Sequence, residues 1–242
     1  MNRSPEARAT LLNELGLSRC AYDWRAEHVP HFEEEILQYK QHDIEFTAFW
    51  GSHDKAFTLF KKYELSPQIW KTLAAPKTGT HEEKMAAAVK QILPLVEQTR
   101  EMGSKLGLYN HGGWAGEPTN MAAVCKILRE EHNAGHVGII YNFHHGHGDI
   151  TQFEQAFQTM LPYLHCVNLN GVTDPATLTA ATKIIPLGSG VHESAMMQVV
   201  LDSDFEGPIG ILGHIKEQDV KVSLQNNLSG LQDIKRQLRT NP

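Results

Sequence analysis

The chain lacks the features that would place it in a membrane, in an oxidising compartment or on nucleic acid. Its only three cysteines, Cys20, Cys125 and Cys166, are far apart and form no Cys-x-x-Cys pair, so buried free thiols are expected. No apolar run is long enough to span a bilayer, and the polar start at residues 1–8 does not resemble a signal peptide. A net charge of -6 offers no basic surface for nucleic acid. These absences favour a cytoplasmic enzyme, although a chain whose leader had been removed would look the same.

Linkers and low-complexity segments are also missing, so residues 1–242 are expected to form a single domain. Helical and extended patterns alternate along it. Ser4 and Pro5 supply an N-cap and a first helical residue. Strands are predicted at 19–24, 45–50, 68–73, 105–110, from 137, 164–170 and 208–212. Helices are predicted at 5–15, 31–41, 55–63, 80–103, 119–131, 150–161, 174–182, 193–201 and 219–238.

Repeated strand–helix units require a parallel sheet with helical crossovers. Polar groups at many strand ends favour a closed (β/α)₈ TIM barrel over an open doubly wound sheet. A Gly-x-Gly-x-x-Gly fingerprint after an early strand is absent, which argues against dinucleotide binding. Only seven strands are convincing, and an eighth requires residues 183–187. Because the chain opens with a helix, we expect an incomplete barrel lacking its first strand, a gap that would favour a homodimer.

Polar side chains gather at the predicted C-terminal ends of the strands. The apolar run from Val137 to Tyr141 is typical of a buried strand, and it ends abruptly in an amide and three imidazoles. Because the loops after the strands of a TIM barrel build one mouth, such groups should converge. The set comprises Asp23, Trp24, Arg25, Trp50, His53, Tyr109, Asn110, His111, Asn142, His144, His145, His147, Asn168, Asn170 and His214.

The histidines after the run have a metal-binding and a structural interpretation. Imidazole is the commonest neutral metal ligand, so His144 and His145 are the metal candidates, with no metal as the open alternative. In extended backbone His145 and His147 face one side and His144 the other. If the strand persists, at most two of the three therefore point into one mouth.

Other candidates are equally open to two interpretations. The amides of Asn110, Asn168 and Asn170 either satisfy loop backbones or hold the hydroxyls of a sugar. The tryptophans at the first two strand ends either belong to the core or stack on a sugar face. The loop at 186–190 is either a plain turn or a set of backbone amides that holds an anion or a hydroxyl.

At these residues the sequence resembles the xylose isomerase-like TIM barrels of the sugar phosphate isomerase/epimerase superfamily. The resemblance implies a barrel that binds a sugar or keto-sugar and holds a divalent metal through Glu, Asp, His and Glu at four strand ends. The metal polarises a carbonyl while two glutamates shuttle a proton at the adjacent carbon. The matching segments are 106–113, 137–147, 166–171, 186–190 and 207–212.

The sequence departs from that pattern at all four ligand positions, which carry Tyr109, Asn142, Asn168 and Leu212. Three carboxylates are thereby replaced by neutral groups, so a hard-cation site should be badly weakened. Any metal would have imidazole ligands with amide or water oxygens, which favours a divalent transition metal such as Zn, Mn, Co, Ni or Fe. The ligands would come from His111, His144, His145 and His214.

We therefore expect a sugar isomerase or epimerase that removes a proton next to a carbonyl, acting on a small carbohydrate. A keto-sugar lyase and a non-catalytic sugar-binding barrel that has lost its metal centre are the alternatives. Neutral histidines can serve as acid and base without a metal. The predicted catalytic residues are His111, His145 and Tyr109, and the predicted substrate-binding residues are Asp23, Arg25, Trp50, Asn142, Asn168, Asn170 and His214.

Overall fold

The first helix, α1 (Pro5–Glu14), begins where the sequence places an N-cap and a proline. The Ser4 side chain accepts a hydrogen bond from the backbone N–H of Ala7 at 3.2 Å, which confirms this start. The computed structural model describes residues 3–213, 215 and 218–240 and separates into two compact units. Unit 1 holds the described residues up to Leu108 together with Ile127–Val137, and unit 2 holds the remainder.

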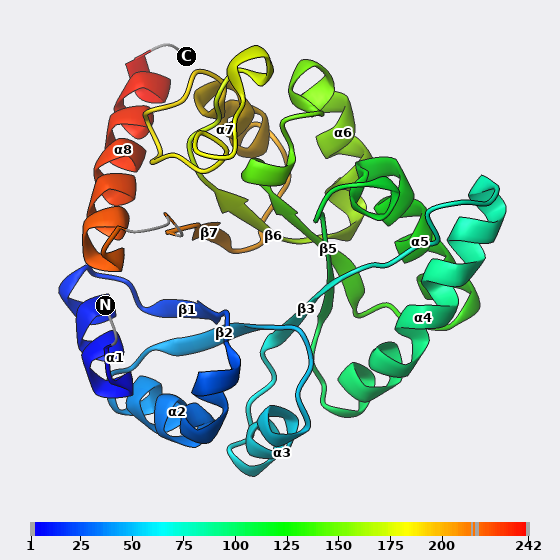
Figure 1. Ribbon diagram of the computed structural model, residues 1–242, viewed down its shortest axis with the longest axis horizontal. Coiled ribbons are helices and arrows are strands. Elements are labelled where there is room, and N and C mark those ends of the chain that lie inside the picture. The colour runs from blue at the N-terminus through cyan, green and yellow to red at the C-terminus, as the bar shows by residue number, and fades with distance from the viewer. Residues whose placement is uncertain (1–2, 214, 216–217, 241–242) are drawn as a thin grey trace. The chain divides into compact units, whose positions relative to one another are not determined.

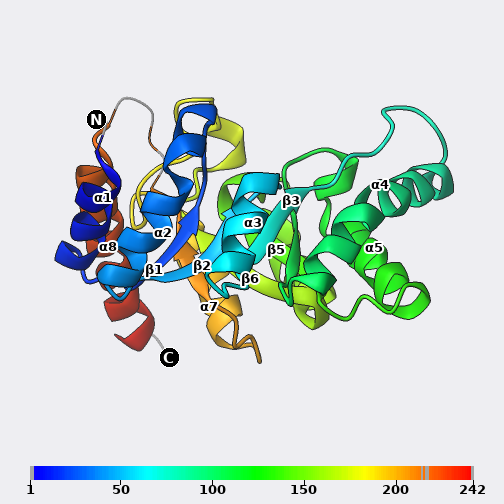
Figure 2. The ribbon, with the colours of Figure 1, turned by 90° about the horizontal axis from the view of Figure 1, so that it is seen from below.

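Unit 1 contains parallel strands that alternate with helices. β1 pairs with β2 in parallel, and β2 pairs with β3 in the same way. In Figure 2, α1 and α2 lie beside β1 and β2. The elements after α1 are β1 (Arg19–Tyr22), α2 (Phe32–Gln41), β2 (Glu45–Trp50), α3 (Asp54–Lys62), β3 (Gln68–Thr72), α4 (His81–Glu101) and β4 (Leu106–Tyr109), whose last residue belongs to unit 2.

Aromatic side chains form the core of unit 1. Phe49 is 1% exposed and contacts the rings of Tyr22, Phe32 and Phe60 at centroid distances of 5.3–6.2 Å. The Trp24 ring stacks on Phe49 at 6.0 Å, and its indole N–H donates to the backbone carbonyl of Trp50 at 2.7 Å. Trp24 therefore belongs to the core, which was one of the two roles considered for it, the other being stacking on a sugar.

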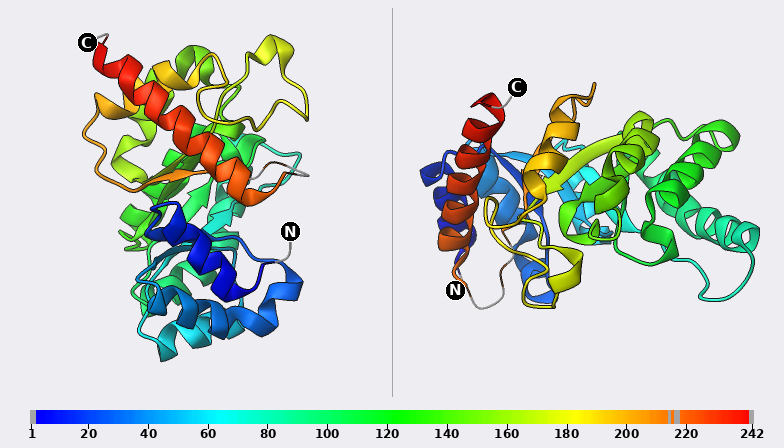
Figure 3. Two further views of the ribbon diagram at one scale, coloured as in Figure 1. Left: turned by 90° about the vertical axis from the view of Figure 1, so that its left-hand side faces the viewer. Right: turned by 90° about the horizontal axis from the view of Figure 1, so that it is seen from above.

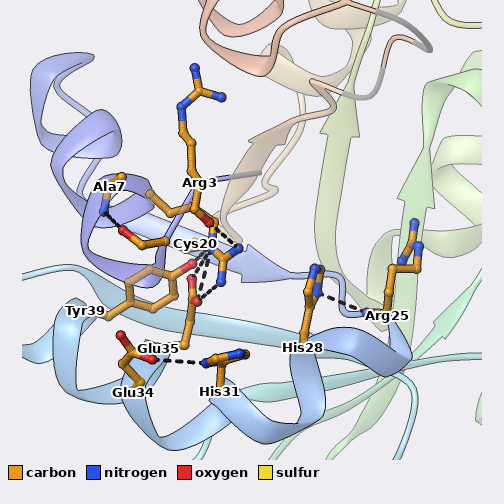
Figure 4. A network of polar contacts seen from close by, with 11 residues as sticks. Arg3, Ala7, Cys20, Arg25, His28, His31, Glu34, Glu35 and Tyr39 are labelled. Carbon is orange, nitrogen blue, oxygen red and sulfur yellow. Dashed lines mark hydrogen bonds and ion pairs between the residues drawn. The ribbon is translucent and has the colours of Figure 1, made fainter. Parts of the chain in front are cut away.

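One buried ion pair fastens α1 to α2. Glu35 of α2 is fully buried, and the Arg8 guanidinium of α1 donates from Nε to both carboxylate oxygens at 3.0 and 3.1 Å and from Nη2 to Oε2. Figure 4 shows Cys20 and Tyr39 beside this pair, and their Sγ and hydroxyl oxygen lie 3.3 Å apart. Burial raises the pKa of Cys20 to about 11, as expected for a free structural thiol.

Unit 2 is arranged around β5, whose six residues are all buried. β5 pairs with β6 and β6 with β7, in parallel, and Figure 1 shows α6 and α7 along one side of these strands. Figure 3 shows α8 as one long helix and the segment 171–192 (yellow) as a long loop. The elements are α5 (Pro118–Glu131), which unit 1 shares, β5 (Val137–Asn142), α6 (Phe153–Met160), β6 (Leu164–Leu169), α7 (Glu193–Leu201), β7 (Ile209–Ile211) and α8 (Val220–Thr240).

The seven strands follow one another in chain order within the sheet. With a helix after each strand, this is the order of a (β/α)₈ TIM barrel with seven strands in the described part of the chain, as predicted. No helix in the described ranges is long and apolar enough to cross a membrane. The homodimer stays a prediction, as does the single domain.

The long loop after β6 contains neither a further strand nor the predicted helix. Residues 183–187, which an eighth strand would have required, form no strand, because Ile185 makes only an isolated antiparallel bridge to Gly171. The helix predicted at 174–182 shrinks to a 3-10 turn at Pro175–Thr177. The hydroxyls of Thr179 and Thr182 bond to each other's backbone N–H groups, and such local side-chain bonds compete with a helix.

Candidate active site

The chain turns sharply where β5 ends at Asn142. Residues Phe143–His145 form a 3-10 turn, and the Tyr141 hydroxyl donates to Asp149 Oδ2 at 2.9 Å, which fastens the segment beyond the turn. A Cβ on Gly146 would lie 2.1 Å from that hydroxyl, so only glycine fits there. The expected strand alternation therefore ends at Asn142. The His144 and His145 rings, predicted to face opposite sides, lie with centroids 3.7 Å apart.

His145 is the centre of a cluster drawn from three segments of unit 2. Its ring centroid lies 4.6 Å from that of His111 and 6.0 Å from that of Tyr109. Lys183, from the long loop after β6, places Nζ 3.4 Å from His145 Nδ1. We call His111, His144, His145, His147 and Lys183 the histidine cluster. The structure thus brings together all three residues predicted as catalytic.

Lys183 is the member that sequence reasoning missed. It lies 38 residues beyond His145 in a segment without periodicity. A single lysine in such a loop is usually a solvated side chain, but this one is only partly exposed. Its place shortly after the asparagine-rich end of β6 was the one available signal.

Burial and neighbouring bases keep the imidazoles neutral. Desolvation, followed by the influence of His145, Lys183 and His111, lowers the pKa of His144 to about 2. Desolvation, followed by the influence of Lys183 and His111, lowers the pKa of His145 to about 3. The pKa of His147 is also lowered, mainly by desolvation. At neutral pH these side chains are therefore uncharged donors and acceptors.

Contacts within the cluster assign the tautomers of two imidazoles. His147 Nδ1 lies 3.1 Å from the His144 carbonyl, which only accepts, so Nδ1 carries the proton and Nε2 is left as an acceptor. The Lys183 ammonium only donates, so His145 Nδ1 accepts and its Nε2 carries the proton. His145 therefore offers an N–H donor, while His147 offers a buried lone pair on Nε2, for which no protein partner lies within the described ranges.

The lowered pKa values predict a loss of stability in acid. Below the ordinary histidine pKa of about 6.5, the unfolded chain binds protons that folded His144 and His145 do not, so the free energy of unfolding falls as pH decreases. Above that pH both states are neutral and neither histidine contributes. We expect the free energy of unfolding to fall by up to about 1.4 kcal/mol per pH unit because of His144, and by less because of the more exposed His145. Urea unfolding at pH 7, 6 and 5 measures this slope. A double variant, His144→Gln with His145→Gln, should flatten it, and an unchanged slope would contradict the assignment.

Of the asparagines at the strand ends, one is structural and the others are candidates for binding a substrate. Asn110 Oδ1 accepts the backbone N–H of Asn142 at 2.9 Å while its Nδ2 donates to the Asn142 carbonyl at 3.1 Å, so Asn110 satisfies loop backbone. The Asn142 side chain is 1% exposed, and neither of its polar atoms has a partner in the described part of the chain. Asn142 is in register with Asn168, and Asn170 Oδ1 is also buried without such a partner. Buried polar atoms of this kind need a ligand or water.

The loop at 186–190 already holds an anion that belongs to the chain. The Glu193 carboxylate is 1% exposed and accepts backbone N–H groups from Gly188 at 3.1 Å, Gly190 at 2.8 Å and Val172 at 2.9 Å. A Cβ on Gly190 would lie 2.2 Å from Glu193 Oε2. Of the two interpretations of this loop, the anion holder is correct, but the anion is Glu193.

The remaining predicted site residues belong to unit 1 or lie outside the described residues. Asp23, Arg25 and Trp50 belong to unit 1, where the Arg25 guanidinium donates to Asp23 Oδ1 at 2.6 Å as an exposed pair. His214 lies outside the described residues. The roles assigned to these four residues stay predictions.

The arrangement was compared with known proteins. No family model matches the chain, and neither does any curated protein. Solved structures match over nearly its whole length. The 3-keto-D-glucoside 4-epimerase YcjR from E. coli superposes with a TM-score of 0.72 at 15% identity, covering 96% of this chain and 95% of that one. This chain has the xylose isomerase-like TIM-barrel fold.

Two further structures with the xylose isomerase-like fold differ in what their names state. The probable 3-DHS dehydratase AsbF from Bacillus anthracis has a TM-score of 0.71 at 16% identity, with 96% and 94% of the two chains covered. The IOLI protein, which has a bound zinc atom, has a TM-score of 0.74 at 13% identity, with 96% and 93% covered. At such identities the likeness extends to the fold alone.

Structures with this fold include proteins bound to zinc and to magnesium, but the described residues of this chain do not fit such a metal. Within the described ranges, no group of three or more His, Cys, Asp or Glu side chains could hold an ion. At the cluster, the Lys183 ammonium faces the Nδ1 lone pair of His145, and its positive charge would repel a cation. In the described part of the chain, the predicted metal pair of His144 and His145 therefore has no third His, Cys, Asp or Glu that could complete an ion site.

Proposed function

We propose that this protein is an isomerase or epimerase of a carbohydrate, removing a proton from the carbon next to a carbonyl. The observation that carries the proposal is the arrangement around His145, whose proton-bearing Nε2 belongs to a neutral ring between Lys183 and His111. The sugar epimerases among the structures with the same fold support a carbohydrate substrate.

In the proposed reaction, His145 Nε2–H donates a hydrogen bond to the substrate carbonyl oxygen. Removal of the adjacent proton places negative charge on that oxygen, and a preoriented donor stabilises it. A neutral imidazole donates without carrying a full charge that must be desolvated in the ground state.

His111 is proposed to take the proton. Its side chain is exposed, so it can exchange the proton with solvent before it returns a proton to the substrate. The Tyr109 hydroxyl, 5% exposed on a ring near His145, is proposed as a second donor to the carbonyl oxygen. The buried amides of Asn142 and Asn170 are proposed to hold hydroxyls of the sugar, with Asn168 beside them.

Hydrogen exchange tests the proposal without knowledge of the product. D-fructose, D-psicose and D-tagatose incubated in D₂O with the protein should gain deuterium next to the carbonyl, followed by proton NMR. His145→Ala should slow the exchange at least about 100-fold, since general acid–base groups contribute 10² to 10⁴. His31→Ala is the control, because His31 is an exposed residue of unit 1 paired with Glu34.

A second candidate is a sugar-binding barrel without catalysis. The absence of a carboxylate from the histidine cluster favours it, because the proton shuttle implied by the family resemblance uses two glutamates. This candidate predicts that sugars bind by calorimetry while no deuterium enters any of them, with or without added Zn²⁺ or Mn²⁺. Such a result would overturn the proposed activity, and His145-dependent exchange would exclude the binding barrel.

A further inference from the structure

Lys183 is a partly buried cation with no acidic partner. Its one direct contact within the described ranges is with His145 Nδ1 at 3.4 Å, and no ion pair involves it there. An ammonium has three N–H donors, so two remain after the bond to His145. A cation that is partly removed from water without a counter-charge is costly unless a ligand supplies that charge.

Within the described ranges no ion pair compensates the charge of Lys183. Lys183 contributes to the lowered pKa of His144, of His145 and of His147. Asp174, in the same long loop, has a half-exposed side chain whose Oδ2 lies 3.6 Å from His192 Nε2. In a chain with a net charge of -6, Lys183 therefore places an ammonium among neutral imidazoles at the candidate active centre.

We propose that Lys183 binds a carboxylate of the substrate, so that the protein acts on a sugar acid in preference to a neutral sugar. This inference deepens the proposed function and rests on it. One ammonium matches the single negative charge of a carboxylate, and His145 Nε2–H remains available for the carbonyl oxygen of the same molecule.

A carboxylate fits the described groups better than a phosphate. A phosphate carries nearly two negative charges and is usually held by several backbone N–H groups. In unit 2 the N–H groups of Gly188 and Gly190 are already taken by Glu193. The remaining donors are one ammonium and neutral side chains, which suits a monoanion.

Three matched ligands test the inference. D-fructose is neutral, 2-keto-D-gluconate carries a carboxylate at C1 of the same skeleton, and D-fructose 1-phosphate carries a phosphate at that carbon. Binding is measured on the intact protein from the ¹⁵N and ring-proton signals of the histidines, which need no turnover. The variants are Lys183→Met, which keeps the apolar stem, and Lys183→Arg, which keeps the charge. Lys126→Met removes an exposed lysine of α5 as the matched control.

We expect 2-keto-D-gluconate to bind at least about tenfold more tightly than D-fructose, because one charge-assisted contact is worth about that factor. Lys183→Met should abolish the preference, whereas Lys183→Arg and Lys126→Met should retain it. In Lys183→Met the His145 signal should also titrate at a higher pH. Equal binding of all three ligands, tighter binding of the phosphate, no binding of the acid at 50 mM, or an unchanged preference in Lys183→Met would each overturn the inference. Binding of the acid without any deuterium exchange would overturn the proposed function and leave only the binding of a carboxylate by Lys183 in place.

Discussion

Replacing Glu193 with alanine is expected to lower the free energy of unfolding by about 3 kcal/mol or more. The carboxylate is buried and accepts three backbone N–H groups, from Val172, Gly188 and Gly190. Each N–H left without an acceptor costs about 1–3 kcal/mol when water cannot replace the lost partner. Urea unfolding followed by circular dichroism measures the change.

Glu154→Ala is the matched control, because Glu154 is also an acidic residue in the first turn of a helix but is exposed. It should change the unfolding free energy by no more than about 0.5 kcal/mol. Glu193→Gln keeps one acceptor oxygen, so its loss should be intermediate. If the alanine variants at 193 and 154 were equally stable, the carboxylate would not hold the loop.

Glu193 also helps to position the loop that carries Lys183 of the candidate site. Leu187, within the same loop, donates its backbone N–H to Asn227 Oδ1 of α8 at 3.0 Å, and a Cβ on Gly230 would lie 1.7 Å from the Leu187 carbonyl. The loop is thereby held against α8 downstream of Lys183. Removing Glu193 should therefore weaken the Lys183–His145 contact as well as stability.

Local chemistry made most of the fold predictable. The N-cap at Ser4 forms as expected, and the helix predicted from residue 80 begins there with a capping box of Thr80 and Glu83. The run from Val137 is apolar at every position because β5 is buried on both faces. Strong local signals of this kind survive folding because tertiary packing reinforces them.

The incorrect and missed predictions at the candidate site have physical causes that cannot be read from the sequence. The chain leaves β5 in a 3-10 turn at Phe143–His145, so the predicted alternation of the histidines gives way to two tilted rings with centroids 3.7 Å apart. The close approach of Gly146 to the Tyr141 hydroxyl, which leaves no room for a Cβ, belongs to this turn and is not visible in the sequence. The Lys183–His145 contact joins residues 38 positions apart through a loop with no periodic pattern. Residues His111 and His145 were predictable because both follow strands, and parallel strands end at one edge.

Arg8→Ala is expected to destabilise the protein by about 3 kcal/mol, through a charge left buried without a partner. Glu35 is fully buried, and removing the guanidinium leaves its carboxylate uncompensated, which costs about 3–5 kcal/mol in buried pairs. The lower end applies because the Arg8 side chain is 29% exposed and water can partly replace it. Thermal and urea unfolding measure the loss.

A control variant and a double variant show whether the lost stability comes from the buried charge or from the packing of the Arg8 side chain. Arg19→Ala breaks the pair with Glu45, in which both side chains are more than half exposed, and it should cost no more than about 1 kcal/mol. Adding Glu35→Gln to Arg8→Ala removes the buried charge while keeping the shape of the side chain, so the double variant should recover part of the lost stability. A double variant less stable than Arg8→Ala alone would mean that α1 is held to α2 mainly by the apolar stem of Arg8. In that case Pro5, Ala9 and Leu11, the buried residues of α1, would contribute to the attachment together with that stem.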